Sequence, residues 1–122
     1  MTDGIRSHRE LMIWQRGMAL ADVIELLVDR LPLGERPRLG DQMIRAVRSI
    51  PANIAEGHGR FTPADFARFL TMAHGSLTEL DTHLEVAKRR AFVTLEEWNG
   101  LDASVQELAR MIRAFRASLR RR

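Results

Sequence analysis

The chain has 122 residues, a length that suits one domain and is too short for two ordinary ones. Apolar residues make up 45%, enough for a core, and the absence of cysteine excludes disulfides, thiolate zinc sites and cysteine nucleophiles. The formal net charge is +3, yet residues 110–122 hold six arginines and no acid, so the other 13 basic and 16 acidic residues sum to −3. Such a basic end is typical either of a surface that attracts polyanions or of a solvated helix terminus.

The location predicted from the sequence is the cytoplasm. The first residues contain no apolar stretch of signal-peptide length. The longest apolar run, residues 18–28, is interrupted by Asp22 and Glu25, which argues against a membrane span. We therefore expect a soluble protein with no membrane partner.

The first half of the chain predicts two helices, over about residues 9–30 and 38–57. In the first, apolar residues recur at spacings of four and three from Ile13 to Leu31, the pattern of a helix face that packs on a core. The proline-containing turn at residues 31–37 ends it. Pro51 lies inside the second helix, where we expect a kink rather than a break.

The second half predicts helices over about residues 63–90 and 95–119. Thr62 and Pro63 are suited to the cap and the first position of one helix, and Thr94 with Glu97 forms a capping box for the other. Short connections between long amphipathic helices favour antiparallel neighbours. The sequence therefore predicts an all-α fold, an antiparallel up-down-up-down four-helix bundle that forms a single domain over residues 1–122.

A second apolar stripe runs beside the core face of the first predicted helix. Together the two stripes cover more than the roughly 100° sector usual for a surface helix of a monomer. We interpret the second stripe as a subunit interface, although Trp14 in it can instead cover the edge of the bundle. Its members are Leu11, Trp14, Met18, Ala21 and Val28.

A polar row follows the apolar row of the second helix. If the second and third helices fold about the turn near Thr62, Arg45 faces Glu79 and Ser49 faces Ser76. This register predicts a semi-buried hydrogen-bonded network that fixes the alignment of the two helices. The predicted network comprises Arg45, Ser49, Asn53, Glu56, Ser76 and Glu79.

Catalytic and metal chemistry have little support in the sequence. Glu56 or Glu79 can be considered as a general base, but no nucleophile or histidine accompanies them. Di-iron bundles need carboxylates on all four helices and two Glu-x-x-His pairs, which this chain lacks. We expect no enzymatic activity, no catalytic residue, no metal and no cofactor.

Two segments carry a resemblance to a known family. Residues 42–57, Gln-x-x-Arg-Ala-x-x-Ser-Ile-Pro-x-Asn-Ile-Ala-Glu-Gly, and residues 73–80, Ala-His-Gly-Ser-x-x-Glu-Leu, resemble the four-helix-bundle proteins encoded in intervening sequences of bacterial large-subunit ribosomal RNA genes. The resemblance implies a ring-like homopentamer. It also implies kinship with the accessory variability proteins of diversity-generating retroelements, which are basic, bind nucleic acid and associate with a reverse transcriptase.

The function expected from these features is a non-enzymatic, homo-oligomeric adaptor that binds nucleic acid (RNA or DNA), a protein partner, or both. The alternative is a purely protein-binding scaffold without affinity for nucleic acid. Two basic patches are the candidate nucleic-acid-binding residues, one at the end of the fourth helix and one at the end of the third. They are Arg110, Arg113, Arg116 and Arg120, and Lys88, Arg89 and Arg90.

Overall fold

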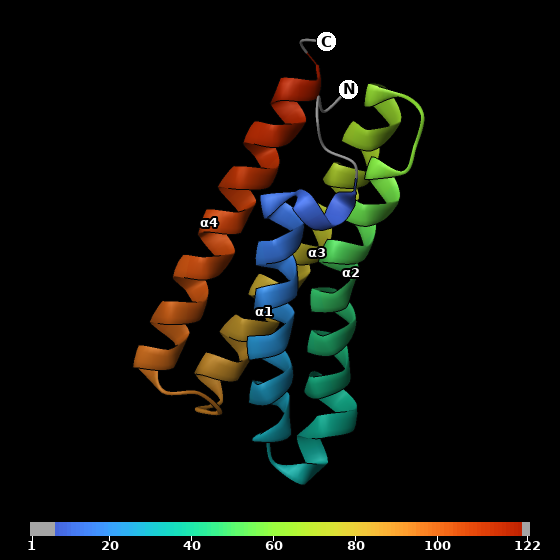
Figure 1. Ribbon diagram of the computed structural model, residues 1–122. Helices are drawn as coiled ribbons and strands as arrows, with labels where there is room; N and C mark the ends of the chain where they lie inside the picture. Colours follow the sequence, from blue (N-terminus) through green and yellow to red (C-terminus); the bar gives the residue numbers. More distant parts are fainter. Residues whose placement is uncertain (1–6, 121–122) are drawn as a thin grey trace.

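The computed structural model describes residues 7–120 and consists of four long α-helices. They are α1 (Met12–Asp29), α2 (Asp41–His58), α3 (Pro63–Arg89) and α4 (Leu95–Leu119). Residues 7–120 contain no strand, so the prediction of an all-α fold is confirmed. Figure 1 shows the helices side by side, with the chain reversing direction at each connection.

The four helices are unequal in length and in the extent of their contacts. α3 and α4 have 27 and 25 residues, whereas α1 and α2 have 18 each. α2 and α3 share the most extensive contact, while α1 and α4 share the least of the neighbouring pairs. The α1–α4 seam is therefore the loosest part of the helix packing.

α1 begins three residues later than the sequence pattern predicted. Leu11 has an extended backbone (φ −74°, ψ 126°) and separates α1 from a short 3-10 turn, η1 (His8–Glu10). The α1–α2 connection also contains local helical structure, a 3-10 turn η2 (Leu33–Glu35) and a π-helical turn η3 (Arg36–Gly40).

The starts of α3 and α4 have side-chain caps at the predicted residues. The Thr62 hydroxyl accepts a hydrogen bond from the Asp65 backbone N–H at 3.1 Å, and Pro63 occupies the first turn, where its missing N–H costs nothing. Thr94 and Glu97 form the reciprocal capping box, at 3.0 Å and 2.9 Å.

The end of α3 is closed by a left-handed residue that is not glycine. Ala91 has φ 59°, its N–H donates to Lys88 O, and the N–H of Phe92 donates to Ala87 O. These two bonds are those of a Schellman motif, in which glycine is the usual left-handed residue. The buried apolar row of α3 ends at Ala87, and Ala91 is exposed.

The core is built from the predicted apolar rows of all four helices. Among residues 7–120 the buried residues are apolar or glycine, and none of them is polar or charged. The largest fully buried side chains include Ile24 of α1, Met43 of α2, Phe66 of α3 and Ile112 of α4. α2 runs through Pro51 without interruption, and Gly17 of α1 faces this proline, because a Cβ added at Gly17 would lie 3.4 Å from Pro51 Cδ.

Candidate nucleic-acid interface

The C-terminal half of α4 presents arginines on the side away from its core row. Arg110, Arg113 and Arg120 are exposed, and Arg116 is half-buried. The apolar residues Ile112 and Leu119 of the same segment are buried, so the helix is held while its basic side remains accessible. Arg121 and Arg122, which extend the basic segment in the sequence, lie outside the described residues.

The arginines of α4 differ from those of α1 and α2 in their partners. Within α1 and α2 every arginine has a carboxylate partner: Arg16 pairs with Glu107, Arg45 with Glu79 at 3.0 Å, and Arg48 with Glu25 at 2.5 Å. Over residues 7–120, none of Arg110, Arg113, Arg116 and Arg120 forms an ion pair with a carboxylate. The charge at the end of α4 is therefore uncompensated.

An open groove of about 570 Å³ lies between the start of α3 and the end of α4. Ala64 and Ala67 line the α3 side, and their small side chains leave room between the two helices. Arg68 of α3 and Arg116 and Arg120 at the end of α4 also line it. We call this the α3–α4 groove.

The arginines of the α3–α4 groove retain unused hydrogen-bond donors. Arg116 Nε is buried and has no hydrogen-bond partner within the described chain, and Arg68 donates from Nε to Asp65 Oδ1 at 3.3 Å. Guanidinium groups bind phosphate with several N–H donors at once. The groove is therefore lined by three side chains of the type that binds phosphate groups.

His74 extends this basic face toward the middle of α3. Its Nε2 lies 3.0 Å from Arg113 Nη1, and because a guanidinium only donates, the imidazole accepts this hydrogen bond. Burial lowers the pKa of His74 below its ordinary value, and the charges of Arg113 and Arg116 lower it further. His74 is therefore neutral at pH 7, and the positive charge of this face comes from arginine.

The second predicted patch lies at the opposite end of the molecule, where α3 meets α4 (Figure 1). Lys88 and Arg89 pair with Glu85 at 3.2 Å and 2.9 Å, and Lys88 Nζ lies 3.8 Å from the centroid of the Trp98 ring. Hydrogen bonds from Arg89 and then Lys88 lower the pKa of Glu85, which keeps it ionised. Only Arg90 of this patch is without a carboxylate partner among residues 7–120, so we place the principal site at the α3–α4 groove.

The predicted contact between Arg45 and Glu79 is present, but it lies at the surface. The side chains are 68% and 42% exposed, so the expectation of a semi-buried pair is wrong. The two side chains are exposed because the polar row lies at the edge of the α2–α3 contact and not inside it. An exposed pair of this kind contributes about 0–1 kcal/mol to stability.

The rest of the polar row binds its own helix. Ser49 donates to Ala46 O at 2.9 Å, and Asn53 Nδ2 donates to Ser49 O at 2.8 Å, while Glu56 lies 3.7 Å from Arg60. Ser76 is half-buried on α3, and no hydrogen bond joins it to Ser49 among the described residues. These bonds flank Pro51, which cannot donate a backbone hydrogen bond within α2.

The predicted interface stripe of α1 is mostly covered by the chain itself. Leu11, Ala21 and Val28 are buried, Trp14 is half-buried, and only Met18 is exposed. The prediction that Leu11, Ala21 and Val28 belong to a subunit interface was therefore wrong. The physical reason is that a helix of a bundle packs against more than one neighbour. α2 lies along one side of this stripe. The π-helical turn η3 covers Val28, because Val28 Cγ1 lies 2.9 Å from a Cβ built at Gly40.

Several exposed apolar side chains were not identified from the sequence. Met12, Val23 and Leu26 of α1 are exposed, and Val23 lines two grooves along the α1–α4 seam. Phe61, in the α2–α3 connection, is fully exposed. Arg68 was also missed, because its place beside Arg116 depends on how α3 and α4 align.

No group of three or more His, Cys, Asp or Glu side chains within residues 7–120 is placed to hold a metal ion. Of the helices in this part of the chain, none combines the length and apolar character that crossing a bilayer requires.

Comparisons with known proteins place these features in context. The family model described as 23S rRNA-intervening sequence protein matches residues 9–114. A crystal structure of a protein of unknown function from the S23 ribosomal protein family of Bacteroides thetaiotaomicron VPI-5482 superposes with a TM-score of 0.79 at 24% identity, over 85% of this chain and 97% of that chain. This likeness supports the fold. No curated protein matches the sequence significantly. Arg116 and Arg120 lie beyond the matched residues.

Proposed function

The chain belongs to the family of 23S rRNA-intervening sequence proteins, and on that premise we propose that it is a non-enzymatic adaptor that assembles with copies of itself and binds nucleic acid along the α3–α4 groove. The proposal includes the up-down-up-down bundle, in which successive helices are antiparallel. It also includes the cytoplasm as the place of action.

The observation that carries the proposal is the uncompensated charge of α4. Four arginines lie in residues 110–120 without a carboxylate partner in the described chain, and two of them line the α3–α4 groove together with Arg68. Arginines with free donors beside an open groove match the phosphate backbone of a nucleic acid, which supplies most of the affinity of sequence-tolerant binding.

Self-association is proposed as a cyclic homo-oligomer, with five subunits as the resemblance implies. Support comes from α1, where Met18, Val23 and Leu26 remain exposed although each is apolar. A second copy is the partner that best explains them, because exposed apolar side chains on one helix gain stability when they are buried. In such an assembly each subunit would contribute one α3–α4 groove, and the repeated grooves would raise the affinity for a long polyanion.

We propose no catalytic role for the two acids considered as bases. Glu79 and Glu56 each form a surface ion pair, with Arg45 and Arg60 respectively, and these pairs account for both without chemistry. The expectation that no histidine accompanies Glu79 is wrong, because His83 Nε2 lies 3.3 Å from Glu79 Oε2 one turn along the same helix.

Binding can be tested by fluorescence anisotropy with labelled RNA and DNA at 50 mM and 200 mM salt. We expect affinity to fall steeply with salt, because counterions are released where arginines meet phosphates. Replacing Arg113, Arg116 and Arg120 with glutamine should reduce the salt slope by about one for each lost phosphate contact. A matched control, Arg30→Gln with Arg36→Gln and Arg45→Gln, removes the same charge elsewhere and should leave the slope almost unchanged.

The alternative is a protein-binding scaffold, and one observation favours it. Apolar grooves of about 240 Å³ and 660 Å³ follow the α1–α4 seam, and they can accept apolar side chains of another protein. If the wild-type protein retains neither RNA nor DNA at 50 mM salt, the nucleic-acid proposal fails and the scaffold replaces it.

A further inference from the structure

Phe61 is an aromatic side chain with no cover from the described chain. It is fully exposed, whereas Phe66 and Phe69 of the following helix are buried. Among residues 7–120 the Phe61 ring also has no ring or cation partner, while the guanidinium groups of Arg60 and Arg68 lie over Phe69 at 4.7 Å and 4.6 Å. Both faces of the Phe61 ring are therefore free to stack.

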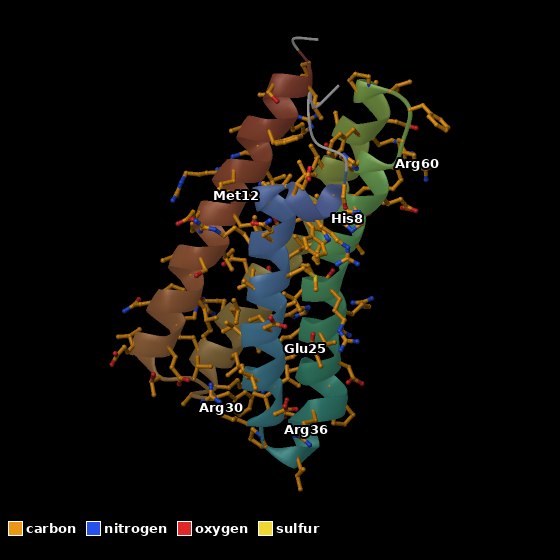
Figure 2. All side chains as sticks on the ribbon, viewed as in Figure 1. His8, Met12, Glu25, Arg30, Arg36 and Arg60 are labelled. Carbon is orange, nitrogen blue, oxygen red and sulfur yellow. The ribbon has the colours of Figure 1, made fainter. Side chains whose placement is uncertain are left out.

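Phe61 lies close in the chain to the α3–α4 groove. Pro63, two residues further along the chain, lines this groove, and two residues span at most about 7 Å. Figure 1 shows the α2–α3 connection and the end of α4 at the same end of the molecule, and Figure 2 places Arg60 there as well. A free aromatic ring and a set of arginines thus share one end of the bundle.

The combination of a free aromatic ring and a basic groove indicates whether the nucleic acid is single-stranded or double-stranded. Proteins that bind single strands combine a basic groove for the backbone with aromatic rings on which unpaired bases stack. Within a duplex the base faces are already stacked on one another, so a protruding ring reaches a base face only by unstacking a base step, which costs a few kcal/mol. A ring on a surface connection therefore adds affinity for a single strand and little for a duplex.

We propose that the α3–α4 groove binds a single-stranded nucleic acid, with a phosphate held by Arg116, Arg120 and Arg68 and a neighbouring base stacked on Phe61. The inference rests on the proposed function and adds to it the strandedness of the ligand and the residue that selects it. Because stacking does not depend on the identity of the base, the preference is for an unpaired strand and not for a sequence.

The test compares a labelled 12-nucleotide oligothymidine with a 12-base-pair duplex, using the wild type and Phe61→Leu. Leucine keeps the apolar character but removes the π-face, so we expect affinity for the single strand to fall about tenfold and affinity for the duplex to stay the same. Phe61→Trp should retain single-strand binding. Leu95→Ala, which shortens another exposed apolar side chain at the opposite end, should change neither affinity. Since Phe61 is fully exposed, thermal unfolding should be the same for the wild type and both Phe61 variants.

Each outcome separates this inference from the proposed function. If the wild type binds both ligands and Phe61→Leu binds the single strand as well as the wild type does, the stacking inference is wrong while the nucleic-acid function stands. If the wild type binds neither ligand at 50 mM salt, both are wrong.

Discussion

Ala91 holds a backbone conformation that an L-residue adopts at a cost. With φ 59° it lies in the left-handed region, where contact between Cβ and the following carbonyl costs about 1–2 kcal/mol. Ala91→Gly removes this contact, and we expect the free energy of unfolding to rise by about 1 kcal/mol, measured by urea denaturation. As a control, Ala103→Gly introduces the same change at an exposed position inside α4 and should lower stability by about 1 kcal/mol.

His74 couples stability to pH. Its pKa is below the ordinary value because of burial and of Arg113 and Arg116, so the unfolded chain binds a proton more readily than the folded protein does. The free energy of unfolding should therefore fall as the pH is lowered through the ordinary histidine pKa of about 6.5 toward the depressed folded value. His74→Gln should reduce the loss between pH 7.5 and pH 5.5. An unchanged pH dependence in this variant would assign the effect to other groups.

At the scale of single residues, the sequence predicts the basic site only in part. Arg116 and Arg120 follow from a run of arginines without an acid, which is visible in the sequence. Arg68 and Phe61 do not, because one depends on the alignment of α3 with α4 and the other on a connection that leaves its ring uncovered. The contact of Arg45 with Glu79 follows from register, but register says nothing of their exposure.

At the scale of helices, Gly57 determines how closely α2 approaches α3. A Cβ at this position would lie 2.7 Å from Phe69 Cβ and 2.9 Å from Phe66 Cδ1. We expect Gly57→Ala to destabilise the protein by about 1–2 kcal/mol, because overpacking outweighs the gain in helix propensity. Gly75→Ala is the matched control within α3: nothing lies within 4 Å of its Cβ, so stability should rise by about 1 kcal/mol. Thermal or urea unfolding of both variants measures the difference. If both substitutions change the free energy of unfolding in the same direction, Gly57 does not limit the packing of α2 against α3.

The apolar rows and caps predict the four helices well, for a physical reason. Each row must be buried along its whole length, and Thr62 and Thr94 satisfy backbone groups that a helix start leaves free. The start of α1 and the end of α3 depend on single backbone conformations at Leu11 and Ala91, which apolar spacing does not report. Spacing also cannot distinguish a stripe that faces a neighbouring helix from one that faces another subunit, which is why the interface prediction for Ala21 was wrong.

For the whole molecule, the proposed assembly can be tested on the exposed side of α1. Leu26 is 67% exposed, so Leu26→Lys leaves the fold of one chain intact but places a charge in the proposed contact between copies. We expect light scattering to give an oligomer for the wild type and a mass near 13.9 kDa for this variant. Leu33→Lys, at a still more exposed position in the α1–α2 connection, is the control and should stay assembled. A wild-type mass of one chain at micromolar concentration would contradict the proposal.

The short α2–α3 connection also sets an order of events in folding. Only residues 59–62 separate the two helices that share the most extensive contact, so the entropy lost in bringing them together is small. We expect this hairpin to be formed in the transition state, with α1 and α4 adding later along their loose seam. Stopped-flow kinetics should then show that Gly57→Ala mainly slows refolding, whereas Leu20→Ala in α1 mainly speeds unfolding.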